Sequence, residues 1–549
     1  MKKTLSIVLV ICTILSICSF SVAAAPEGTA VSSAAEFAAM AADGKYYLAN
    51  DITLDATYAG PFKGTLDGNG KTLTVSAPIF AAIEGATIKN LTVAGAIDGA
   101  GADAAAVAVT AAGAVTFADI TSKVTITAAK GAGSLLAVAD TTASVNVIGC
   151  RNEGAISGNG TLGGLVGLIN NNQSSVISSE NHGEIHSTEA QAGGIVGSMG
   201  VKNGKAPADS ITIDDCANYG NITGGKAQSG GILAFLCGGA TIKNCVNYGK
   251  IVNTNNKAGG IFGTSIQTTK NVCAISIENC INYGDVYASK VVAGIAARLG
   301  RAVQVEGMNY SIKNCINYGN LGVYSDIPYE GVTLYMGGIA GYAYGGSLTP
   351  ANEVINCVNL GNITADRSYL DAASKLYAGG IIAYVNAVNY ICKNNVNVGT
   401  ITVTGGEATA VGNILYNVKL DAAEGEANNY SVKAIDGATD TFTKVVTADQ
   451  IASGEVAYLI NEAAGETIYY QAIGTDKAPV LEAAKDGSNT ILKNADGTYG
   501  NPVKEPETTE PEETKPAEPV PTGDSALIFA VVAIIALLGV ATVAKRREN

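Results

Sequence analysis

Hydrophobic and polar positions alternate along most of this chain with the two-residue period of β-strands. From Cys245 to Ile251 the chain follows the pattern Cys-x-Asn-x-Gly-x-Ile, and the element Gly-Gly-Ile-Phe-Gly follows at 259–263. The apolar runs are short, rich in β-branched residues and divided by Asn and Gly, and they show no helical period. This pattern predicts short strands separated by turns.

The same pattern is repeated along the chain, and the repetition decides the fold class. Copies that contain the cysteine begin at Cys150, Cys216, Cys245, Cys280, Cys315 and Cys357, and copies with another residue in its place begin at Leu91, Ile120, Ser179 and Asn395. Successive copies are 29 to 42 residues apart, and a period in this range is typical of solenoids, propellers or arrays. We therefore predict an all-β parallel solenoid with about three short strands per coil and coils stacked about 4.8 Å apart.

Stacked coils place equivalent positions of the repeat above one another. The asparagine of the pattern forms one such column, and we expect its side-chain amides to hydrogen bond along the solenoid axis. The residue after this asparagine is a tyrosine in four successive coils, at Tyr219, Tyr248, Tyr283 and Tyr318. These tyrosines are the candidate binding residues. In this interpretation they form an exposed stripe that binds a glycan or a protein. The alternative is a stacked structural ladder without a ligand, and the exposure of the rings decides between the two interpretations.

Two sequence elements resemble a known family. The Gly-Gly-Leu-Val-Gly element at 163–167, together with Asn-Cys-x-Asn-x-Gly-x-Ile, resembles the GLUG repeat of bacterial, Gram-positive and clostridial-type, surface proteins. The segment Phe-Lys-Gly-Thr-Leu-Asp-Gly-Asn-Gly-Lys at 62–71 resembles the opening segment of the same right-handed β-helices. The resemblance covers roughly residues 46–415 and implies a right-handed parallel β-helix in a cell-surface or secreted protein. It supplies no catalytic residues.

The chain is expected to divide into six segments. They are a signal peptide (1–25), an N-terminal capping helix (26–45), the β-helix of repeats (46–416), a small α+β C-terminal module (417–500), a disordered Pro/Glu/Thr linker (501–524) and a C-terminal transmembrane helix with a basic cytoplasmic tail (525–549). The signal peptide is indicated by Lys2 and Lys3 followed by an apolar run and small residues. The anchor is indicated by the uncharged stretch 526–544 and the basic residues behind it.

Local signals predict how the two ends of the solenoid fold. Ser33 with Glu36 is typical of a capping box, for a helix within 31–43 that would cover the open first coil. Residues 46–145 match the repeat less well, and they form either slender coils or a flexible Ala/Gly segment.

The C-terminal module carries its own signals. Thr447 with Gln450 is typical of another capping box, for a helix that continues to Asn461. Strands are expected at 467–473 and near Val480, and Asp-Gly at 496–497 predicts a hairpin turn.

The segment before the apolar C-terminal stretch resembles a Gram-positive wall-sorting signal. Pro-Val-Pro-Thr-Gly at 519–523 stands where Leu-Pro-x-Thr-Gly is expected. Pro519 replaces the leucine and Val520 replaces the proline, so covalent attachment to the wall and plain membrane anchoring both stay open.

Charge and cysteine content narrow the function classes. The formal net charge is −14 and basic residues do not cluster outside the termini, which argues against a nucleic-acid partner. Two of the eleven cysteines lie in the signal peptide, and the odd remainder cannot pair completely. Leu91, Ile120 and Ser179 share the cysteine column, so we predict a small buried position holding free thiols.

Other polar residues give no assigned metal, cofactor or catalytic site. His182, Glu184 and His186 point outward if Ile185 points inward, but two histidines about 13 Å apart on one strand cannot share a zinc ion. Asp-Gly-Asn-Gly at 67–70 fits a tight turn better than a calcium loop. The richest candidate set for catalysis comprises Arg298, Arg301, Glu306, Asp326 and Glu330, whose spacing is irregular.

These observations favour a non-enzymatic, surface-anchored, monomeric β-helix protein that acts in adhesion or in binding an extracellular glycan or protein, and that contacts the membrane through its C-terminal helix. One alternative is a carbohydrate-active β-helix enzyme, either a polysaccharide lyase or a hydrolase. A second alternative is a structural component of a surface layer.

Overall fold

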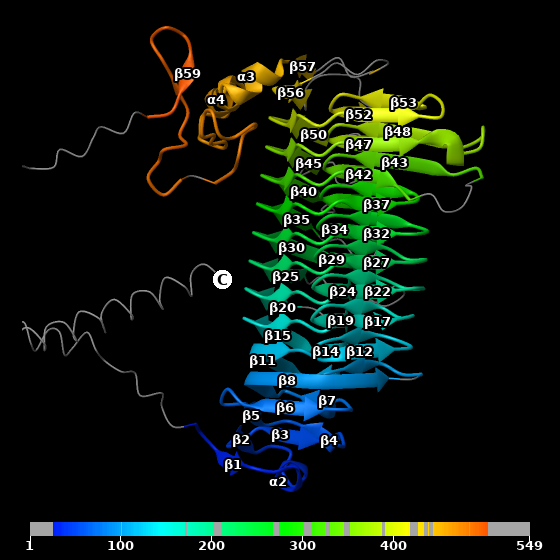
Figure 1. Cartoon of the computed structure of the whole chain (residues 1–549), viewed down its shortest axis with the longest axis vertical. Coiled ribbons are helices and arrows are strands. Elements are labelled where there is room, and N and C mark those ends of the chain that lie inside the picture. The colour runs from blue at the N-terminus through cyan, green and yellow to red at the C-terminus, as the bar shows by residue number, and fades with distance from the viewer. Residues whose placement is uncertain are drawn as a thin grey trace, which may run out of the picture. The chain divides into compact units, whose positions relative to one another are not determined.

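The computed structural model describes residues 26–502 except 100, 171–172, 201–209, 267–273, 301–308, 325–329, 345–351, 387–389, 418–425, 433–437, 439–442 and 483. The described chain is a parallel β-solenoid whose coils stack in register (Figure 1). This confirms the predicted parallel β-solenoid. The predicted signal peptide, the linker apart from its first two residues, and the transmembrane segment lie outside the described residues. Within those residues, no helix has the length and apolar character needed to cross a membrane.

One coil shows how the repeat is used. It consists of five short strands, β30 (Gly239–Lys243), β31 (Val246–Asn247), β32 (Ile251–Asn253), β33 (Lys257–Gly259) and β34 (Phe262–Ser265). The first three belong to a 35-stranded sheet (sheet I), β34 to a 12-stranded sheet (sheet II) and β33 to a 10-stranded sheet (sheet III). The prediction of about three strands per coil was wrong, because turns divide the sheet I face into three segments.

The strands of sheets II and III follow one another coil by coil. Sheet II contains β4 (Tyr58–Phe62), β7 (Phe80–Glu84), β10 (Ala108–Ala112), β14 (Leu136–Ala139), β19 (Val166–Ile169), β24 (Val196–Met199), β29 (Leu233–Leu236), β34, β39 (Ala296–Leu299), β44 (Ala340–Tyr344), β49 (Ile382–Asn386) and β54 (Leu415–Asn417). Sheet III contains β9 (Ala104–Ala105), β13 (Ala132–Gly133), β18 (Leu162–Gly163), β23 (Ala192–Gly193), β28 (Ser229–Gly230), β33, β38 (Val291–Ala293), β43 (Thr333–Gly337), β48 (Lys375–Gly379) and β53 (Ala410–Gly412).

Sheet I has three columns of strands, and the long strands β8 and β11, given with the first column, extend into the others, where they pair with β6, β12 and β16. The first holds β1 (Thr29–Val31), β2 (Lys45–Leu48), β5 (Thr65–Asp67), β8 (Thr87–Gly99), β11 (Ala114–Ser122), β15 (Ser144–Ile148), β20 (Ser175–Ile177), β25 (Ser210–Asp214), β30, β35 (Ile275–Glu278), β40 (Tyr310–Lys313), β45 (Asn352–Ile355), β50 (Tyr390–Lys393) and β55 (Glu426–Ala427). The second holds β3 (Ile52–Leu54), β6 (Thr72–Val75), β16 (Arg151–Asn152), β21 (Glu180–Asn181), β26 (Ala217–Asn218), β31, β36 (Ile281–Asn282), β41 (Ile316–Asn317), β46 (Val358–Asn359), β51 (Val396–Asn397), β56 (Asn429–Ser431) and β57 (Thr443–Val445). The third holds β12 (Thr125–Ala128), β17 (Ile156–Gly158), β22 (Ile185–Ser187), β27 (Ile222–Gly224), β32, β37 (Val286–Ala288), β42 (Leu321–Val323), β47 (Ile363–Asp366) and β52 (Ile401–Thr404).

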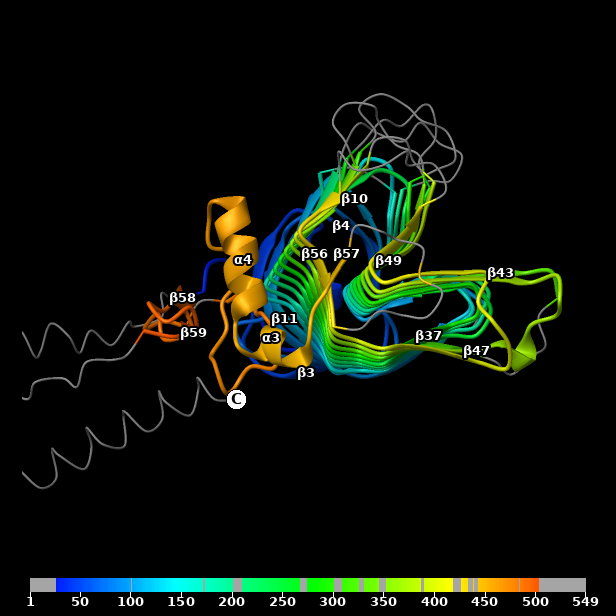
Figure 2. The same ribbon diagram turned by 90° about the horizontal axis from the view of Figure 1, so that it is seen from above.

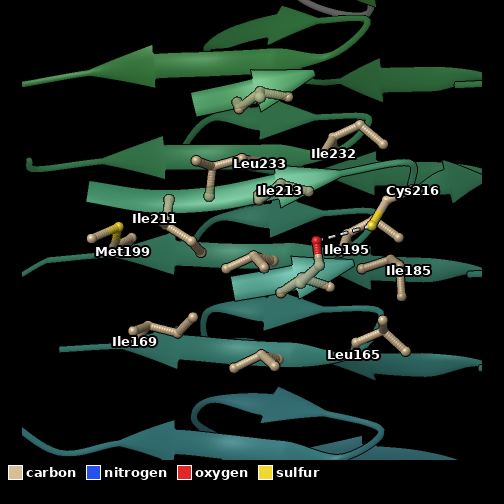
Figure 3. Packing of buried hydrophobic residues seen from close by; sticks show 14 of the residues in the cluster. Leu165, Ile169, Ile185, Ile195, Met199, Ile211, Ile213, Cys216, Ile232 and Leu233 are labelled. Carbon is tan, nitrogen blue, oxygen red and sulfur yellow. Dashed lines mark hydrogen bonds between the residues drawn. The ribbon is translucent and has the colours of Figure 1, made fainter. Parts of the chain in front are cut away.

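A continuous apolar core fills the inside of the coils. Figure 3 shows Ile213 of β25 in this core, together with Ile195 and Cys216 from the turns before β24 and after β25. In the alanine-rich part of the chain the same positions are held by small residues, and Ala104 and Ala108 are fully buried. The segment 46–145 therefore forms slender solenoid coils and not a flexible tether.

The N-terminal end of the core is covered by a short helix, α2 (Ala34–Ala38), which is shorter than the predicted 31–43. Ser33 Oγ accepts the Glu36 N–H, but the Glu36 carboxylate accepts the N–H of Ser32 and not that of Ser33, so the predicted reciprocal box is incomplete. Phe37 is buried, and its ring lies 5.9 Å from that of Phe80 in the core.

At the other end, the solenoid ladder continues through β55, β56 and β57, beyond the predicted boundary at 416. The module that follows contains α3 (Ala448–Ala452) and α4 (Glu455–Ala464) in place of one helix, because Gly454 adopts a positive φ of 82° between them. The capping box of Thr447 and Gln450 is present.

The rest of the module has little regular structure. The strand expected at 467–473 is reduced to a single antiparallel bridge between Tyr470 and Val480. The expected hairpin is formed by β58 (Leu492–Lys493) and β59 (Tyr499–Gly500). A 3-10 turn, η1 (Arg367–Tyr369), lies within the solenoid.

Candidate binding surface

A ladder of buried asparagines positions the outer surface of the second column of sheet I. The Nδ2 of each asparagine donates to the Oδ1 of the asparagine in the next coil at 2.7–2.9 Å, through Asn152, Asn181, Asn218, Asn247, Asn282, Asn317, Asn359 and Asn397. The same Nδ2 donates to the carbonyl of the glycine two positions later at 2.8–3.1 Å. The predicted amide ladder is confirmed.

Because the asparagine side chains point inward, the residue after each one points outward. The main-chain N–H of Tyr248 donates to the Asn218 carbonyl at 2.7 Å, which fixes the main chain from which the ring projects. The rings of His182, Tyr219, Tyr248, Tyr283 and Tyr318 stack with centroids 4.3–5.1 Å apart and interplanar angles of 3–15°. The four predicted tyrosines are therefore brought together, and His182 extends their stack by one coil.

The stack is exposed along most of its length. Tyr219, Tyr248 and Tyr283 have exposed fractions of 42%, 46% and 43%. Tyr318 is half-buried beneath the C-terminal module, and burial is the main cause that raises its pKa to about 12. The pKa values of Tyr219 and Tyr283 are also raised, chiefly by partial burial, so these phenols stay protonated hydrogen-bond donors at neutral pH.

The stacking decides which part of each ring is open to a ligand. Both faces of Tyr248 have a neighbouring ring, at 4.7 Å and 5.1 Å between centroids. The lower face of Tyr219 is covered by His182. The ladder therefore offers ring edges and hydroxyl groups to solvent, and open ring faces are not its main surface.

An apolar column accompanies the exposed rings. The residues before the asparagines in these coils are Ala217, Val246 and Ile281, all half-buried. We call Ala217, Val246, Ile281, Tyr219, Tyr248 and Tyr283 the outer strip. A shallow open hollow along its lower half is lined by Glu180, Ala217, Tyr219, Asn244, Val246 and Tyr248.

The C-terminal module covers the continuation of this column. Ile316, Val358, Val396 and Tyr430 occupy the equivalent positions in later coils, and all are buried. We call these four residues the covered strip. They form one apolar cluster with module residues Ile451, Val456, Ala457, Ile460, Tyr469, Ala478 and Ile491. Figure 2 shows α3 and α4 beside this face of the solenoid.

Charged residues mark the other end of the outer strip. Glu180 Oε2 lies 2.8 Å from His182 Nε2 and 3.5 Å from Arg151 Nη1, and Glu153 lies 3.0 Å from Arg151. The column thus changes from charged to aromatic and apolar within one coil, and it becomes fully covered farther along.

The remaining sequence candidates lie apart from the outer strip. Glu184 and His186 are exposed on another part of sheet I, as the alternation predicted. No group of three or more His, Cys, Asp or Glu residues suited to a metal occurs in the part of the chain that the structure describes. Asp67 Oδ1 accepts the Asn69 N–H at 2.8 Å, and Asn69 has a φ of 50°, so this segment is a tight turn.

The predicted catalytic set is only partly described. Arg298 lies on β39, and Glu330 is exposed in a turn before β43. Arg301, Glu306 and Asp326 lie outside the described residues.

The cysteine column is buried, and no disulfide bond joins its thiols. Cys150, Cys216, Cys245, Cys280, Cys315 and Cys357 are free and at most 1% exposed. Each thiol donates to the main-chain carbonyl two residues earlier, with sulfur–oxygen distances of 3.1–3.4 Å. The prediction of buried free thiols is confirmed for this column.

Sequence reasoning missed two features. The residue before each cysteine adopts a left-handed conformation, as at Asn244 with a φ of 54°, and the repeated Asn-Cys pair was the available signal. A cluster of Tyr335, Tyr342, Tyr377 and Tyr384 joins the outer faces of sheets II and III. The available signal was the pattern Leu-Tyr-x-Gly-Gly-Ile-x-x-Tyr, which occurs at 334–342 and again at 376–384.

The described geometry is that of a parallel β-solenoid with an internal asparagine ladder. No protein-family model matches the chain, and a search of the curated proteins finds no relative. Among solved structures the chain is similar to a candidate immunoglobulin A1 protease from Bacteroides ovatus, with 16% identity and a TM-score of 0.31, over 58% of this chain and 84% of that chain.

It is also similar to an IgA1 protease, with 16% identity and a TM-score of 0.27, over 59% of this chain and 20% of that chain. At this sequence identity and TM-score, neither protein supports an activity for this chain. The surface is therefore described from the residues of this chain alone.

Proposed function

We propose that this chain is a non-enzymatic, surface-displayed binding protein with GLUG-type repeats, and that it holds an extracellular protein ligand on the outer strip. The observation that carries the proposal is the outer strip itself, with three exposed tyrosines beside Val246 and Ile281. Contiguous exposed apolar and aromatic surface of this kind is typical of interaction sites. The predicted export signal and anchor would present it outside the cell.

The geometry of the rings favours a protein over a glycan as the ligand. Each exposed ring has its faces occupied by stacked neighbours, so a sugar ring finds no open aromatic platform. Ring edges, phenol hydroxyls and half-buried aliphatic side chains instead suit a protein surface, where tyrosine is a common central contact. The same apolar column already packs against protein in the covered strip.

The proposal is tested with the compact unit ending at Pro502, produced from residue 26 onward. The protein is applied to a panel of purified collagen, fibronectin and laminin and to a glycan array. We expect a protein to be bound, and Tyr248→Lys to weaken its binding about tenfold or more, because a charge would replace a central aromatic contact.

Tyr287→Ala is the matched control. Tyr287 lies in the same coil as Tyr283 but on the third column of sheet I, under Lys250 at 4.8 Å. Its removal should leave binding unchanged. Binding that survives Tyr248→Lys and Tyr283→Lys, or a ligand found only among the glycans and bound equally by both variants, would contradict the proposal.

The enzymatic alternative is tested separately. The same protein is incubated with acidic and neutral polysaccharides, and release of new reducing or unsaturated ends is measured. We expect none. Turnover that disappears on replacing Lys257, a half-buried lysine on β33, would overturn the non-enzymatic part of the proposal.

A further inference from the structure

The hollow along the lower half of the outer strip contains a carboxylate that no cation neutralises. Asp215 and Ser178 belong to its lining, and Asp215 Oδ2 accepts the Ser178 hydroxyl at 2.8 Å. Asp215 is exposed, and it forms no ion pair with any described residue. The residue before it, Asp214, is in contrast paired with Lys243 at 3.1 Å. Asp215 therefore brings an uncompensated negative charge to the hollow.

A second carboxylate lines the same hollow. Glu180 has a side chain that is 40% exposed, and it meets His182 at 2.8 Å and Arg151 at 3.5 Å, both through Oε2. These contacts leave its Oε1 available to a ligand. The charge of Glu180 reaches the neighbouring phenol, because burial and then this charge raise the pKa of Tyr219. A cation in the hollow would therefore find two carboxylates.

Apolar groups line the rest of the hollow. Ala217 and Val246 are half-buried, and the rings of Tyr219 and Tyr248 stand beside them. The hollow has a volume of about 270 Å³, several times the roughly 30 Å³ of a water molecule. It therefore has room for one long side chain whose aliphatic stem contacts these groups while its charged end reaches the carboxylates.

Negative charge also borders the other end of the outer strip. Burial, followed by Tyr248 and by the charge of Glu482 in the C-terminal module, raises the pKa of Tyr283. Glu482 is exposed. The whole chain carries a formal net charge of −14. A basic protein surface would thus be attracted from a distance and complemented at both ends of the strip.

The covered strip shows which protein groups pack on the apolar part of this column. There Val456 and Ile460 of α4 form one cluster with Ile316 and Val358. Ile281 of the outer strip packs against the same cluster, so the two strips are continuous. Aliphatic side chains of a partner should lie on the outer strip in the same way, with the acidic hollow beside them.

We propose that the protein ligand of the outer strip inserts an arginine side chain into this hollow, with its guanidinium at Asp215 and Glu180 and its stem on Ala217 and Val246. This inference rests on the function proposed above and adds the kind of partner, a protein surface with an exposed arginine among aliphatic residues. The planar guanidinium presents five N–H donors, which suits two carboxylates and neighbouring phenol oxygens. Arginine is also common at the centre of protein interfaces.

Two peptides that differ in one charge test the inference. The same protein is titrated in a calorimeter with acetyl-Leu-Arg-Leu amide and with the peptide that carries neutral citrulline in place of arginine. We expect the arginine peptide to bind about fivefold more tightly at low ionic strength, because only it is attracted by the carboxylates. The difference should be largely lost at about 1 M salt, where the screening length falls to about 3 Å.

Asp215→Asn identifies the carboxylate. It should weaken binding of the arginine peptide about three- to fivefold and leave the citrulline peptide unaffected. Glu184→Gln is the matched control, because it removes the same charge from an exposed residue on another part of sheet I. Tyr248→Lys should weaken both peptides, since it places a cation beside the hollow. Circular dichroism of each variant verifies that the solenoid is retained.

The outcomes separate this inference from the function on which it rests. Failure of the arginine peptide to bind, equal affinity of the two peptides, or equal effects of Asp215→Asn and Glu184→Gln would overturn the arginine site. A panel protein whose binding is weakened by Tyr248→Lys and not by Asp215→Asn would also overturn it, while the proposed function would stand. Binding of neither the panel nor the peptides through Tyr248 would overturn both.

Discussion

At the scale of single residues, the cysteine position explains why a reactive residue type serves here as structure. The thiol of Cys245 donates to the Lys243 carbonyl at 3.1 Å, next to the left-handed turn at Asn244. Ser179 fills the same position and donates to the Ile177 carbonyl at 2.8 Å. In these coils the position holds a small side chain that donates one hydrogen bond, and in the first coils Leu91 and Ile120 fill it, so it does not require sulfur chemistry.

Burial should make these thiols unreactive. It raises the pKa of Cys150 to about 12, and it also raises those of Cys216, Cys245, Cys280 and Cys315. Near pH 8 only about one Cys150 thiol in ten thousand would be ionised, and the thiolate is the reactive form. We expect iodoacetamide to leave these cysteines unlabelled in the folded protein and to label all of them in concentrated guanidinium.

The measurement is mass spectrometry of the cysteine-containing peptides. Rapid labelling of Cys245 or Cys280 in the native protein would show that the column is open to solvent.

At the scale of the repeated element, the asparagine and the glycine of the pattern act together. Asn247 is fully buried and donates both to Asn282 Oδ1 and to the Gly249 carbonyl, each at 2.8 Å. A Cβ at Gly249 would overlap the carbonyl oxygen of Gly220 in the coil below. The asparagine therefore links the coils, and the glycine lets them approach closely enough for that link.

Removing one asparagine of the buried ladder should destabilise the solenoid more than removing an exposed asparagine. Asn247→Ala leaves the amide of Asn218 and the Oδ1 of Asn282 without their buried partners, and we expect the free energy of unfolding to fall by about 2–4 kcal/mol. Asn221→Ala is the matched control, because Asn221 is exposed and accepts one main-chain N–H, from Lys250 at 3.0 Å.

The control should cost less than about 1 kcal/mol. Both variants are compared by urea denaturation followed by far-ultraviolet circular dichroism. Equal midpoints for the two variants would show that the ladder contributes little to stability.

The sequence predicted the cysteine column and the asparagine ladder because each residue type recurs at one fixed position of the repeat. The same logic placed Tyr219, Tyr248 and Tyr283 in one stack. It could not show that Tyr318 is covered, because Tyr318 packs against a cluster that includes residues far along the chain, among them Ile460 and Tyr469.

At the scale of the whole solenoid, the apolar residues of one outer column explain where the C-terminal module packs. The position before the asparagine is Arg151 and Glu180 in early coils, Val246 and Ile281 in the middle, and buried aliphatic residues in later coils. An outer surface that becomes apolar along the axis needs a cover where it is most apolar, and α4 supplies part of that cover through Val456 and Ile460.

Deleting the module should therefore expose the covered strip. A chain ending at Val445 keeps β57 but loses every module residue that packs on Ile316, Val358 and Val396. We expect this chain to bind a hydrophobic dye strongly and to self-associate in analytical ultracentrifugation, because a large apolar patch would face water. Replacing these three residues by threonine in the shortened chain should restore a monomer with little dye binding. A shortened chain that stays monomeric without the replacements would show that the column of apolar residues does not need the module.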